Sequence, residues 1–517
     1  MIFRNALSLP KKYGFEILFV LMILIHLFPI WKFPYFPTQD GPSHIYNAQI
    51  LKDFSDSDYA FNKYYNLNLK LFPNWTCYIV MAFFQYIVSP IVSEKIFLTI
   101  YIVTMALSFL YLLKSFGHKK GIFSILGFVY IYNFLFLMGF YNFSIALPLF
   151  LFSIGYFWKH KESIKWKNGI ILALFLTATF FSHPIPYMVL VIIIFALSLV
   201  YFKKRFKGIV FNIGCMIPSL ALFAHYIISS GMLTSKRSPS SYWNLPRLLS
   251  DLFSIKSLAS FNLIEQTKIG YILAGLMGLL LIITIIRKLS IKKVNLIIKL
   301  EEKDYMFIAL IITFALYVYL PDGVDNQGGF VTSRMNLMTS FLIIPLLSEN
   351  IGRIIRKIAI ALMLILVLGN FVYLYNYFDI LNYELEEYNA GVGTIGNNIV
   401  MMPLIFDKGG NSQLVQIFTH APNYYCLDNG NINLGNYEAA QHYFPINFRS
   451  EFERPTISQV HYAPNEIDFA KLSSYVDCIV AFGYDKNILD KVGKHYNLVM
   501  RRDRLRIFKI NPHNSEP

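Results

Sequence analysis

Residues 33–54 read FPYFPTQDGPSHIYNAQILKDF and follow directly on the first long apolar run of the chain. Pro42 fixes its own φ and moves Gly41 away from helical geometry, so we predict a helix that begins at Pro42 and leaves Asp40 just outside its first turn. The free N–H groups and the dipole of that helix favour a charged carboxylate at Asp40, and His44 can point into the same space. The alternative is that Asp40 only caps the helix and His44 is a solvated side chain.

The composition is that of a polytopic membrane protein. Of the 517 residues, 55% are hydrophobic and 15% are charged, whereas about 25% are charged in soluble domains. The net charge of +15 does not indicate nucleic-acid binding, because the basic residues gather in short loops between apolar runs. No small-residue cleavage site follows the first run, so we expect it to remain as a membrane anchor. The richness in Ile, Lys, Asn and Phe indicates an AT-rich bacterial genome, and hence the bacterial cytoplasmic membrane.

We predict a polytopic α-helical membrane protein of about 11–13 spans with a C-terminal α/β domain. The apolar runs that suit spans lie near 15–32, 73–90, 95–113, 121–138, 142–158, 169–184, 187–202, 208–229, 269–286, 305–320, 335–348 and 357–378.

The basic loops predict the orientation. By the positive-inside rule the following loops are cytoplasmic: 114–120, 158–167, 203–207, 287–304 and 353–357. Alternation then places these segments outside, together with Asp40: 139–142, 182–186, 230–267, 321–334 and the chain after about residue 380. One conflict remains, because an odd number of crossings must separate Asp40 from loop 114–120, yet two apolar runs intervene. We interpret 73–90 as a partial or re-entrant run, since Pro73 opens it and Pro90 closes it.

The predicted domains are a transmembrane domain at 1–380, with a large first outer loop at 33–72, and a soluble extracytoplasmic α/β domain at 381–517. Strands are predicted within NNIVMMPLIF, LVQIFT, VDCIVAFGY, NLVMRR and LRIFKI, and a helix at 486–494. If this domain is extracytoplasmic, Cys426 and Cys478 could form a disulfide. The Asn- and Tyr-rich stretch 423–443 offers aromatic faces suited to sugar stacking, although such residues are also common in ordinary loops.

The predicted outer turns hold most of the unusual polar residues. Besides Asp40 and His44 these are Tyr141, Asn142, His183, Asp322, Asp325 and Arg334. Ionisable groups at the bilayer edge are costly unless they are paired or face a wet cavity, so their gathering on one side predicts a site. Each has a structural alternative: His183 would satisfy backbone groups in its proline turn, Arg334 would snorkel to the headgroups, and the two aspartates would form loops.

A carboxylate, a histidine and an arginine at the membrane surface suit the transfer of a group away from a lipid phosphate. The carboxylate takes the proton of an attacking hydroxyl or holds a divalent cation, and the arginine grips the phosphate with its planar fork. This chemistry needs no nucleotide, and the sequence contains neither a Gly-rich phosphate loop nor a Walker sequence.

This layout resembles the GT-C superfamily of integral membrane glycosyltransferases. The similarity in sequence is carried by TQDGPSH, by the Pro73–Phe116 region with its Ser93-Glu94-Lys95 break, and less specifically by GFYN and SHPIP. The resemblance implies inverting transfer of a sugar from a polyprenyl-phosphate donor, on the outer face, to a glycan, lipid or protein acceptor of the cell envelope.

In this resemblance Asp40 matches the acidic residue of the first loop, whose implied role is general base or metal ligand. Gly41 stands where a second acid is usual, and His44 is an addition, so the need for a divalent metal, Mg²⁺ or Mn²⁺, stays open. From their positions we expect His44 to assist Asp40. We expect the following residues to bind the lipid phosphate or sugar: His183, Arg334, Tyr141, Asn142, Asp322 and Asp325.

Two other function classes remain open at this point. A transporter or flippase of a lipid-linked or polar solute would place coupling charges near the midplane and often shows inverted repeats; the apolar runs hold almost no central charges and the halves are dissimilar. A non-catalytic glycan-assembly subunit would use the soluble domain to bind a glycan or a partner.

Overall fold

The computed structural model describes residues 2–203, 205–230, 242–292, 301–323 and 329–510. The chain divides into two compact units, and each is described by itself. Unit 1 comprises Met1–Phe28, Thr99–Phe136 and Asn142–Tyr375, and unit 2 comprises Pro29–Leu98, Leu137–Tyr141 and Asn376–Pro517.

Seven helices among the described residues are long and apolar enough to cross a bilayer. The helices that contain these segments are α1 (Ile2–Lys32), α5 (Pro90–Ser115), α7 (Tyr141–His160), α9 (Pro184–Phe202), α10 (Phe206–Ser229), α12 (Leu263–Lys292) and α15 (Arg353–Asn389), the last followed by α16 (Val392–Ile395). The chain is therefore an integral membrane protein. The predicted fold class, a polytopic α-helical protein with a C-terminal sheet domain, is confirmed.

Several predicted runs are shorter helices. Run 169–184 forms α8 (Trp166–Ser182), run 305–320 forms α13 (Met306–Tyr319) after η3 (Glu302–Tyr305), and run 335–348 forms α14 (Val331–Phe341) and η4 (Ile344–Leu346). Run 121–138 is not a span: it folds as η1 (Ile122–Tyr130) and α6 (Phe134–Leu137). Every residue of η1 is buried, so hydropathy there reports burial inside the protein and not contact with lipid.

The conflict between Asp40 and loop 114–120 is resolved by α4 (Thr76–Gln85). Ten residues of α-helix are about 15 Å long, roughly half the thickness of the hydrocarbon core. The interpretation of run 73–90 as a partial run is confirmed by this length. Only α5, which has 26 residues, is long enough to cross between these two points.

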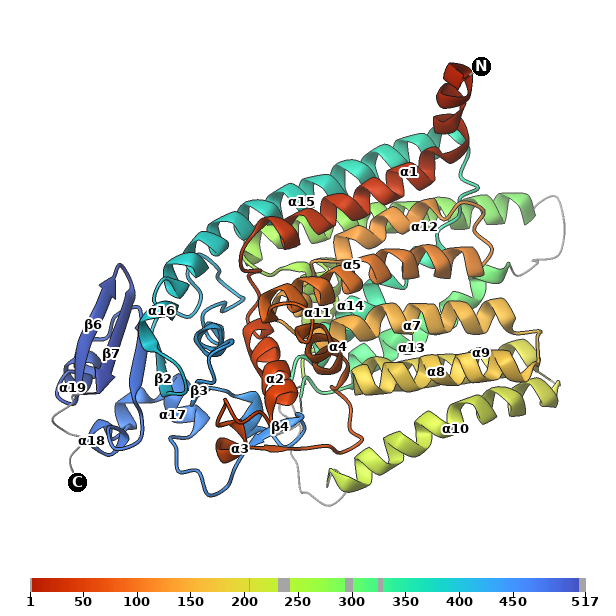
Figure 1. Cartoon of the computed structure of the whole chain (residues 1–517). Helices are drawn as coiled ribbons and strands as arrows, with labels where there is room; N and C mark the ends of the chain where they lie inside the picture. Colours follow the sequence, from red (N-terminus) through yellow and green to blue (C-terminus); the bar gives the residue numbers. More distant parts are fainter. Residues whose placement is uncertain (1, 204, 231–241, 293–300, 324–328, 511–517) are drawn as a thin grey trace. The chain divides into compact units, whose positions relative to one another are not determined.

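Unit 1 is a helical bundle in which α8, α9 and α10 pack on one another and α13 packs on α9 and α14 (Figure 1). The predicted cytoplasmic loops meet at one end of this bundle. There Lys161 forms a 2.9 Å ion pair with Glu302, and the ring of Trp158 lies 4.8 Å from that of Phe116 and 4.7 Å from that of Tyr305. The turn between α8 and α9 lies at the opposite end. The shorter α11 (Leu245–Phe253) and η2 (Lys256–Leu258) complete the described part of the unit.

Unit 2 joins the first loop to the C-terminal segment. The first loop supplies α2 (Gly41–Asp53), α3 (Phe61–Tyr64) and β1 (Tyr65–Leu67), and β1 pairs antiparallel with β4 (Ile446–Phe448). A five-stranded sheet has the order β3-β2-β5-β7-β6. Its strands are β2 (Val400–Ile405), β3 (Ile432–Asn433), β5 (Cys478–Phe482), β6 (Tyr496–Arg502) and β7 (Leu505–Ile510).

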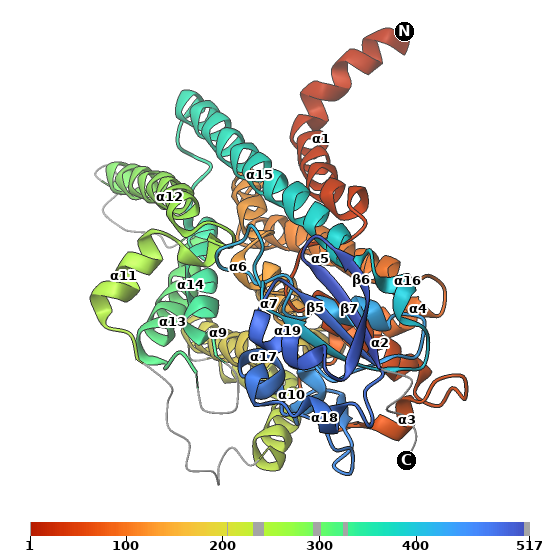
Figure 2. The same ribbon diagram turned by 90° about the vertical axis from the view of Figure 1, so that its left-hand side faces the viewer.

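In this sheet β2 is parallel to β3 and β5, whereas β7 is antiparallel to β5 and β6. Figure 2 labels β5, β6 and β7 of this sheet. Both faces of β2 and β5 are buried. The predicted helix at 486–494 is α19 (Lys486–Val492). The remaining short helices are η5 (Ala421–Cys426), η6 (Glu438–Ala440), α17 (Ile457–Tyr462), η7 (Pro464–Glu466) and α18 (Phe469–Leu472).

One predicted strand is wrong, because LVQIFT forms an irregular loop. Val415, Ile417 and Phe418 are buried, so their spacing is not the alternation of a strand. The backbone N–H of Gln416 donates to the side-chain oxygen of Gln39 at 3.0 Å. Cys426 and Cys478 are buried free thiols, not a disulfide.

Candidate active site

Asp40 is held by a neighbouring turn of unit 2. It occupies the N-cap position of α2, but its side chain makes no capping hydrogen bond. The backbone N–H groups of Gln39 and Asp40 donate to the carbonyls of Leu137 and Met138 at 3.1 and 3.2 Å. Gly139 has a φ of +83°, and a Cβ on it would lie 2.6 Å from the backbone nitrogen of Asp40. Only glycine satisfies both constraints, so the GFYN turn fits directly against Asp40.

The Asp40 carboxylate is buried, with 4% of the residue exposed. Its Oδ2 accepts the hydroxyl of Tyr437 at 3.0 Å, and its Oδ1 accepts Nε2 of Gln39 at 3.2 Å. Nε2 of His420 lies 3.5 Å from Oδ1. Burial raises the pKa of Asp40 to about 7, against the opposing effects of His44 and of these hydrogen bonds. The carboxylate is therefore a buried, titratable group and not a helix cap.

His44 lies on the first turn of α2 with both ring nitrogens engaged. Nε2 is 2.8 Å from the carbonyl oxygen of Gly139, which can only accept, so Nε2 carries a proton. Nδ1 is 2.8 Å from Glu438 Oε1. Burial lowers the pKa of His44, but Glu438, Asp40 and the hydrogen bond to Gly139 together outweigh burial, and the net pKa is raised above 6.5. His44 is thus an imidazolium in a buried ion pair and not a solvated side chain.

Glu438 is fully buried and completes this pair from η6 of the C-terminal segment. Its Oε2 accepts the hydroxyl of Tyr78 at 2.6 Å and Nδ2 of Asn47 at 2.7 Å. Asn47 also exchanges two side-chain hydrogen bonds with Asn436, at 2.8 and 3.2 Å. Glu438 therefore fixes α2 against the C-terminal segment through donors from α2 and α4.

A further carboxylate, Glu94, lies beside Gly41. It accepts the hydroxyl of Tyr141, which also bonds to Thr38 Oγ1 at 2.9 Å. A Cβ on Gly41 would lie 2.3 Å from Thr38 Oγ1 and 2.5 Å from Glu94 Oε1. No side chain fits at position 41, and the space that an acid there would enter is filled by Glu94. Tyr141 thereby joins this cluster, with its ring 5.2 Å from that of His44.

Two histidines of the C-terminal segment extend the cluster beyond Asp40. The ring of His420 stacks on Tyr437 at 4.2 Å and meets the ring of His461 edge-on at 5.3 Å. Burial lowers the pKa of both, to about 4 for His461. The Nζ of Lys408 donates to the carbonyl of His461 at 2.7 Å. Both histidines are neutral at pH 7, so His420 offers Asp40 a polar but uncharged partner.

His183 and Arg334 form a second cluster, in unit 1. Both face the ring of Phe143: the guanidinium carbon of Arg334 is 5.4 Å from its centre, and the ring of His183 is 5.3 Å away. Nδ1 of His183 accepts the backbone N–H of Ile185 at 3.2 Å, which satisfies its turn as the structural alternative expects. Nε2 therefore carries the proton of the neutral ring.

The other predicted residues have plainer surroundings. Asp322 accepts the backbone N–H of Thr332 at 3.0 Å and acts as a loop former. Asn142 is buried at the start of α7. Asp325 lies outside the described residues. In the 423–443 stretch, Tyr424 and Tyr425 are buried, whereas Tyr437 contacts Asp40 directly.

The residues around Asp40 do not form a ligand set for a divalent metal. Both carboxylate oxygens accept hydrogen bonds from protein donors, and His44 acts on the carboxylate as a nearby positive charge. Mg²⁺ and Mn²⁺ prefer several oxygen ligands. No group of three or more His, Cys, Asp or Glu residues in the described part of the chain has the arrangement of a metal site.

No family model matches the chain, and no curated protein sequence matches it. Among solved structures it is similar to the crystal structure of ArnT from Cupriavidus metallidurans in the apo state, at 11% sequence identity and a TM-score of 0.51, over 98% of this chain and 100% of that chain. This chain has the fold of ArnT. The predicted resemblance is confirmed at the level of the fold.

Four of the residues that surround Asp40 and His44 are not among the predicted site residues: Tyr437, Glu438, His420 and Glu94. Tyr437 and Glu438 lie in the Asn- and Tyr-rich stretch 423–443. His420 directly follows LVQIFT, and Glu94 lies in the Ser93-Glu94-Lys95 break. The one available signal was the density of Asn and Tyr at 423–443, which is typical of a buried hydrogen-bond network as much as of a sugar platform.

The first prediction concerns the buried ion pair. We expect Glu438→Gln to destabilise the protein at low pH by roughly 3–5 kcal/mol, because it leaves the His44 cation without a counter-ion. A raised histidine pKa stabilises the fold fully below the unfolded pKa of about 6.5 and loses this effect as the pH rises through the folded pKa. The difference in melting temperature between wild type and variant should therefore shrink above pH 6.5, as measured by thermal unfolding in detergent from pH 5 to 9.

Glu451→Gln is the matched control, since Glu451 is an exposed glutamate of the same segment. It should unfold like the wild type at every pH. A pH-independent difference for Glu438→Gln would contradict the charged state of His44.

Proposed function

We propose that this chain is a GT-C glycosyltransferase that moves a sugar from a polyprenyl-phosphate donor to an acceptor on the outer face of the bacterial cytoplasmic membrane, with inversion. The observation that carries the proposal is Asp40, a buried carboxylate with a pKa of about 7 in a chain with this fold. A general base works best when its pKa lies near the working pH. The acceptor is a glycan, a lipid or a protein of the cell envelope.

In the proposed step the acceptor hydroxyl gives its proton to Asp40 while its oxygen forms a bond to the anomeric carbon of the sugar. The bond from that carbon to the phosphate oxygen breaks, and polyprenyl phosphate leaves with the electron pair. A single displacement inverts the anomeric centre. Protonated Asp40 then returns its proton to water, so the enzyme is restored.

His44 and Glu438 act as positioning residues. Both nitrogens of His44 are engaged, so it has no free nitrogen for proton transfer in this state. Its positive charge lowers the pKa of Asp40 and limits the effect of burial. Without this cation a carboxylate so deeply buried would stay protonated at neutral pH.

We assign the lipid phosphate to the cluster of His183 and Arg334. A guanidinium binds phosphate in a bidentate fashion and neutralises the charge of a leaving group. Phe143 holds the guanidinium from one side. The neutral His183 presents Nε2–H as a further donor. Tyr141, Asn142, Asp322 and Asp325 remain candidate contacts of the donor.

The outer-face assignment rests on the basic loops. They gather at one end of unit 1, as the ion pair of Lys161 with Glu302 illustrates, whereas His183 and Arg334 lie at the opposite end. Placing the basic end in the cytoplasm follows the positive-inside rule. The sugar would then be transferred outside, where no nucleotide is present and a lipid-linked donor is required.

The second prediction tests Asp40. We expect Asp40→Asn to lower kcat about 10²–10⁴-fold, which is the usual contribution of a general base. The melting temperature should not fall at pH 8, because the amide removes a buried charge. In the wild type the rate should rise with pH up to about 7 and then level off, since only the deprotonated carboxylate accepts a proton. The assay is transfer from a polyprenyl-phosphate sugar in proteoliposomes.

Asp58→Asn is the matched control, because Asp58 is an exposed aspartate of the same first loop; it should keep full activity. Full activity of Asp40→Asn would refute the catalytic assignment. Solute flux without any chemical conversion in the same proteoliposomes would favour the transporter alternative.

The third prediction tests Arg334. We expect Arg334→Gln to lower kcat/KM for the lipid-linked donor roughly 10²–10³-fold, the effect of removing one donor to a developing oxyanion. The pH dependence near 7 should persist, because Asp40 is unchanged. Lys165→Gln, at an exposed residue of the basic end, should leave both parameters as in the wild type. An unchanged kcat/KM in Arg334→Gln would show that Arg334 does not bind the lipid phosphate.

The fourth prediction concerns the metal. The resemblance to the GT-C superfamily leaves open a need for Mg²⁺ or Mn²⁺, and Asp40 is the only residue proposed to bind such a metal. Because both oxygens of Asp40 already accept hydrogen bonds, we expect transfer to continue after EDTA treatment and removal of the chelator. Loss of activity that returns on adding Mg²⁺ or Mn²⁺ would show that the substrate brings a metal into the site.

A further inference from the structure

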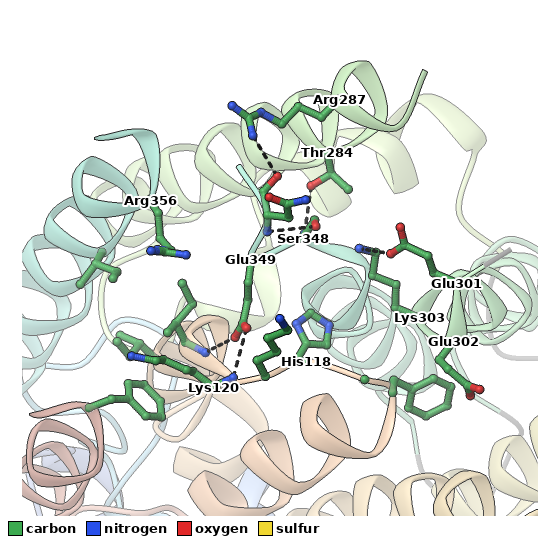
Figure 3. Close-up of a pocket in the computed structure, with 18 of the residues that line it drawn as sticks. His118, Lys120, Thr284, Arg287, Glu301, Glu302, Lys303, Ser348, Glu349 and Arg356 are labelled. Carbon is green, nitrogen blue, oxygen red and sulfur yellow. Dashed lines mark hydrogen bonds and ion pairs between the residues drawn. The ribbon is translucent and has the colours of Figure 1, made fainter. Parts of the chain in front are cut away.

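Unit 1 contains a cavity of about 1280 Å³ at its basic end. It is surrounded by α1, the loop that follows α5, the end of α12, η3 and the start of α15. Figure 3 shows that its charged side chains come from separate segments: Lys120 from the loop after α5, Arg287 from α12, Lys303 from η3 and Arg356 from α15. None of these residues belongs to the cluster around Asp40 or to that of His183.

The cavity has an excess of positive charge. Six lysines and arginines line it, namely Lys119, Lys120, Arg287, Lys288, Lys303 and Arg356, against three glutamates, Glu301, Glu302 and Glu349. The basic residues of the lining thus outnumber its acidic residues two to one. An anion that enters this space therefore meets net attraction.

The glutamates are already bound. Glu349 accepts the backbone N–H groups of Gly121 at 2.6 Å, Ile122 at 2.9 Å and Lys120 at 3.1 Å. Glu301 pairs with Lys303 at 2.6 Å, and Glu302 pairs with Lys161 at 2.9 Å.

Four cations are left without an acidic partner. Lys288 pairs with Asp304, and Arg287 donates to the carbonyl oxygen of Asn350 at 3.3 Å. Among the described residues no carboxylate forms an ion pair with the side chain of Lys119, Lys120, Arg287 or Arg356. Lys119, Lys120 and Arg356 are exposed to the cavity or to solvent. These groups are free to bind an anion.

One wall of the same cavity is apolar. Phe15 and Leu18 of α1 and Ile360 of α15 line it, together with Gly14, whose missing side chain leaves open space. Both α1 and α15 contain segments that can cross a bilayer. A ligand of this cavity therefore meets both cationic groups and apolar side chains, and a phospholipid offers groups that match both.

We propose that this cavity binds an anionic phospholipid of the cytoplasmic leaflet, with its phosphate among Lys119, Lys120 and Arg356 and an acyl chain along α1 and α15. Lysines and arginines near a membrane surface attract anionic lipids. A pocket between helices on the cytoplasmic side also encloses the lipid head group, so binding becomes specific to this place. The lipid bridges α1, α5, α12 and α15 and so stabilises the bundle at the end remote from His183 and Arg334.

The fifth prediction is tested by lipid binding to the intact chain, so its result does not depend on glycosyl transfer. Native mass spectrometry of the purified protein should show one bound phosphatidylglycerol and at least about tenfold weaker binding of phosphatidylcholine. The variant Lys119→Gln, Lys120→Gln, Arg356→Gln should bind phosphatidylglycerol about 100-fold more weakly, at roughly fivefold for each lost cation.

The matched control is Lys165→Gln, Lys167→Gln, Arg353→Gln. This control also removes two lysines and one arginine, but from exposed positions that do not line the cavity. It should bind phosphatidylglycerol like the wild type. Equal weakening in both triple variants would overturn the proposal, because it would show a diffuse attraction of the basic surface.

Two further measurements on the wild-type protein test the lipid site if the cavity variant does not fold. Wild-type protein that does not distinguish phosphatidylglycerol from phosphatidylcholine would overturn it. So would displacement of the lipid by millimolar inorganic phosphate or glycerol phosphate, since the ligand would then be a soluble phosphate compound. Retention of the lipid against both competitors supports the lipid as the occupant.

Discussion

The imidazolium of His44 connects three segments of unit 2 that are far apart in the sequence. It lies on the first turn of α2 and donates to the carbonyl of Gly139 in the short turn before α7. It also forms an ion pair with the carboxylate of Glu438 in the C-terminal segment. A buried cation must keep its counter-ion and its acceptors, so these segments cannot separate without exposing a charge to an apolar environment. Asp40 lies four residues before His44, and the same contacts set its position.

The parts of this arrangement that follow local rules could be predicted from the sequence. Pro42 predicts the start of α2 to within one residue, since the helix begins at Gly41. The absence of a side chain at Gly41 leaves room for Glu94 and Thr38. The ten-residue α4 between Pro73 and Pro90 follows from the need for an odd number of crossings. The basic loops predict that their segments share one end of unit 1, and the structure places them there.

The rest depends on contacts that no local pattern encodes. Glu438 begins the three-residue η6 and His420 lies in a loop, so neither belongs to a periodic pattern, and their partners are nearly 400 residues away. LVQIFT has the composition of a strand, but it forms a loop whose apolar side chains at 415, 417 and 418 are buried. Run 121–138 has the hydropathy of a span, yet η1 is covered by protein on every side. Hydropathy measures the preference for leaving water and does not tell lipid from protein interior.

The charges and hydrogen bonds of the Asp40 cluster account for the raised pKa of the Asp40 carboxylate. Glu438 and His44 form a buried ion pair, and Tyr78 and Asn47 both donate hydrogen bonds to Glu438. Glu94 is tied to Tyr141 beside Gly41. Asp40 has only hydrogen-bond donors without full charge at its two oxygens, because His420 is neutral. Burial therefore acts on Asp40 with less opposition than on an ion-paired acid, and its pKa comes to lie near neutrality. The pairing of its neighbours is thus what leaves Asp40 free to gain and lose a proton.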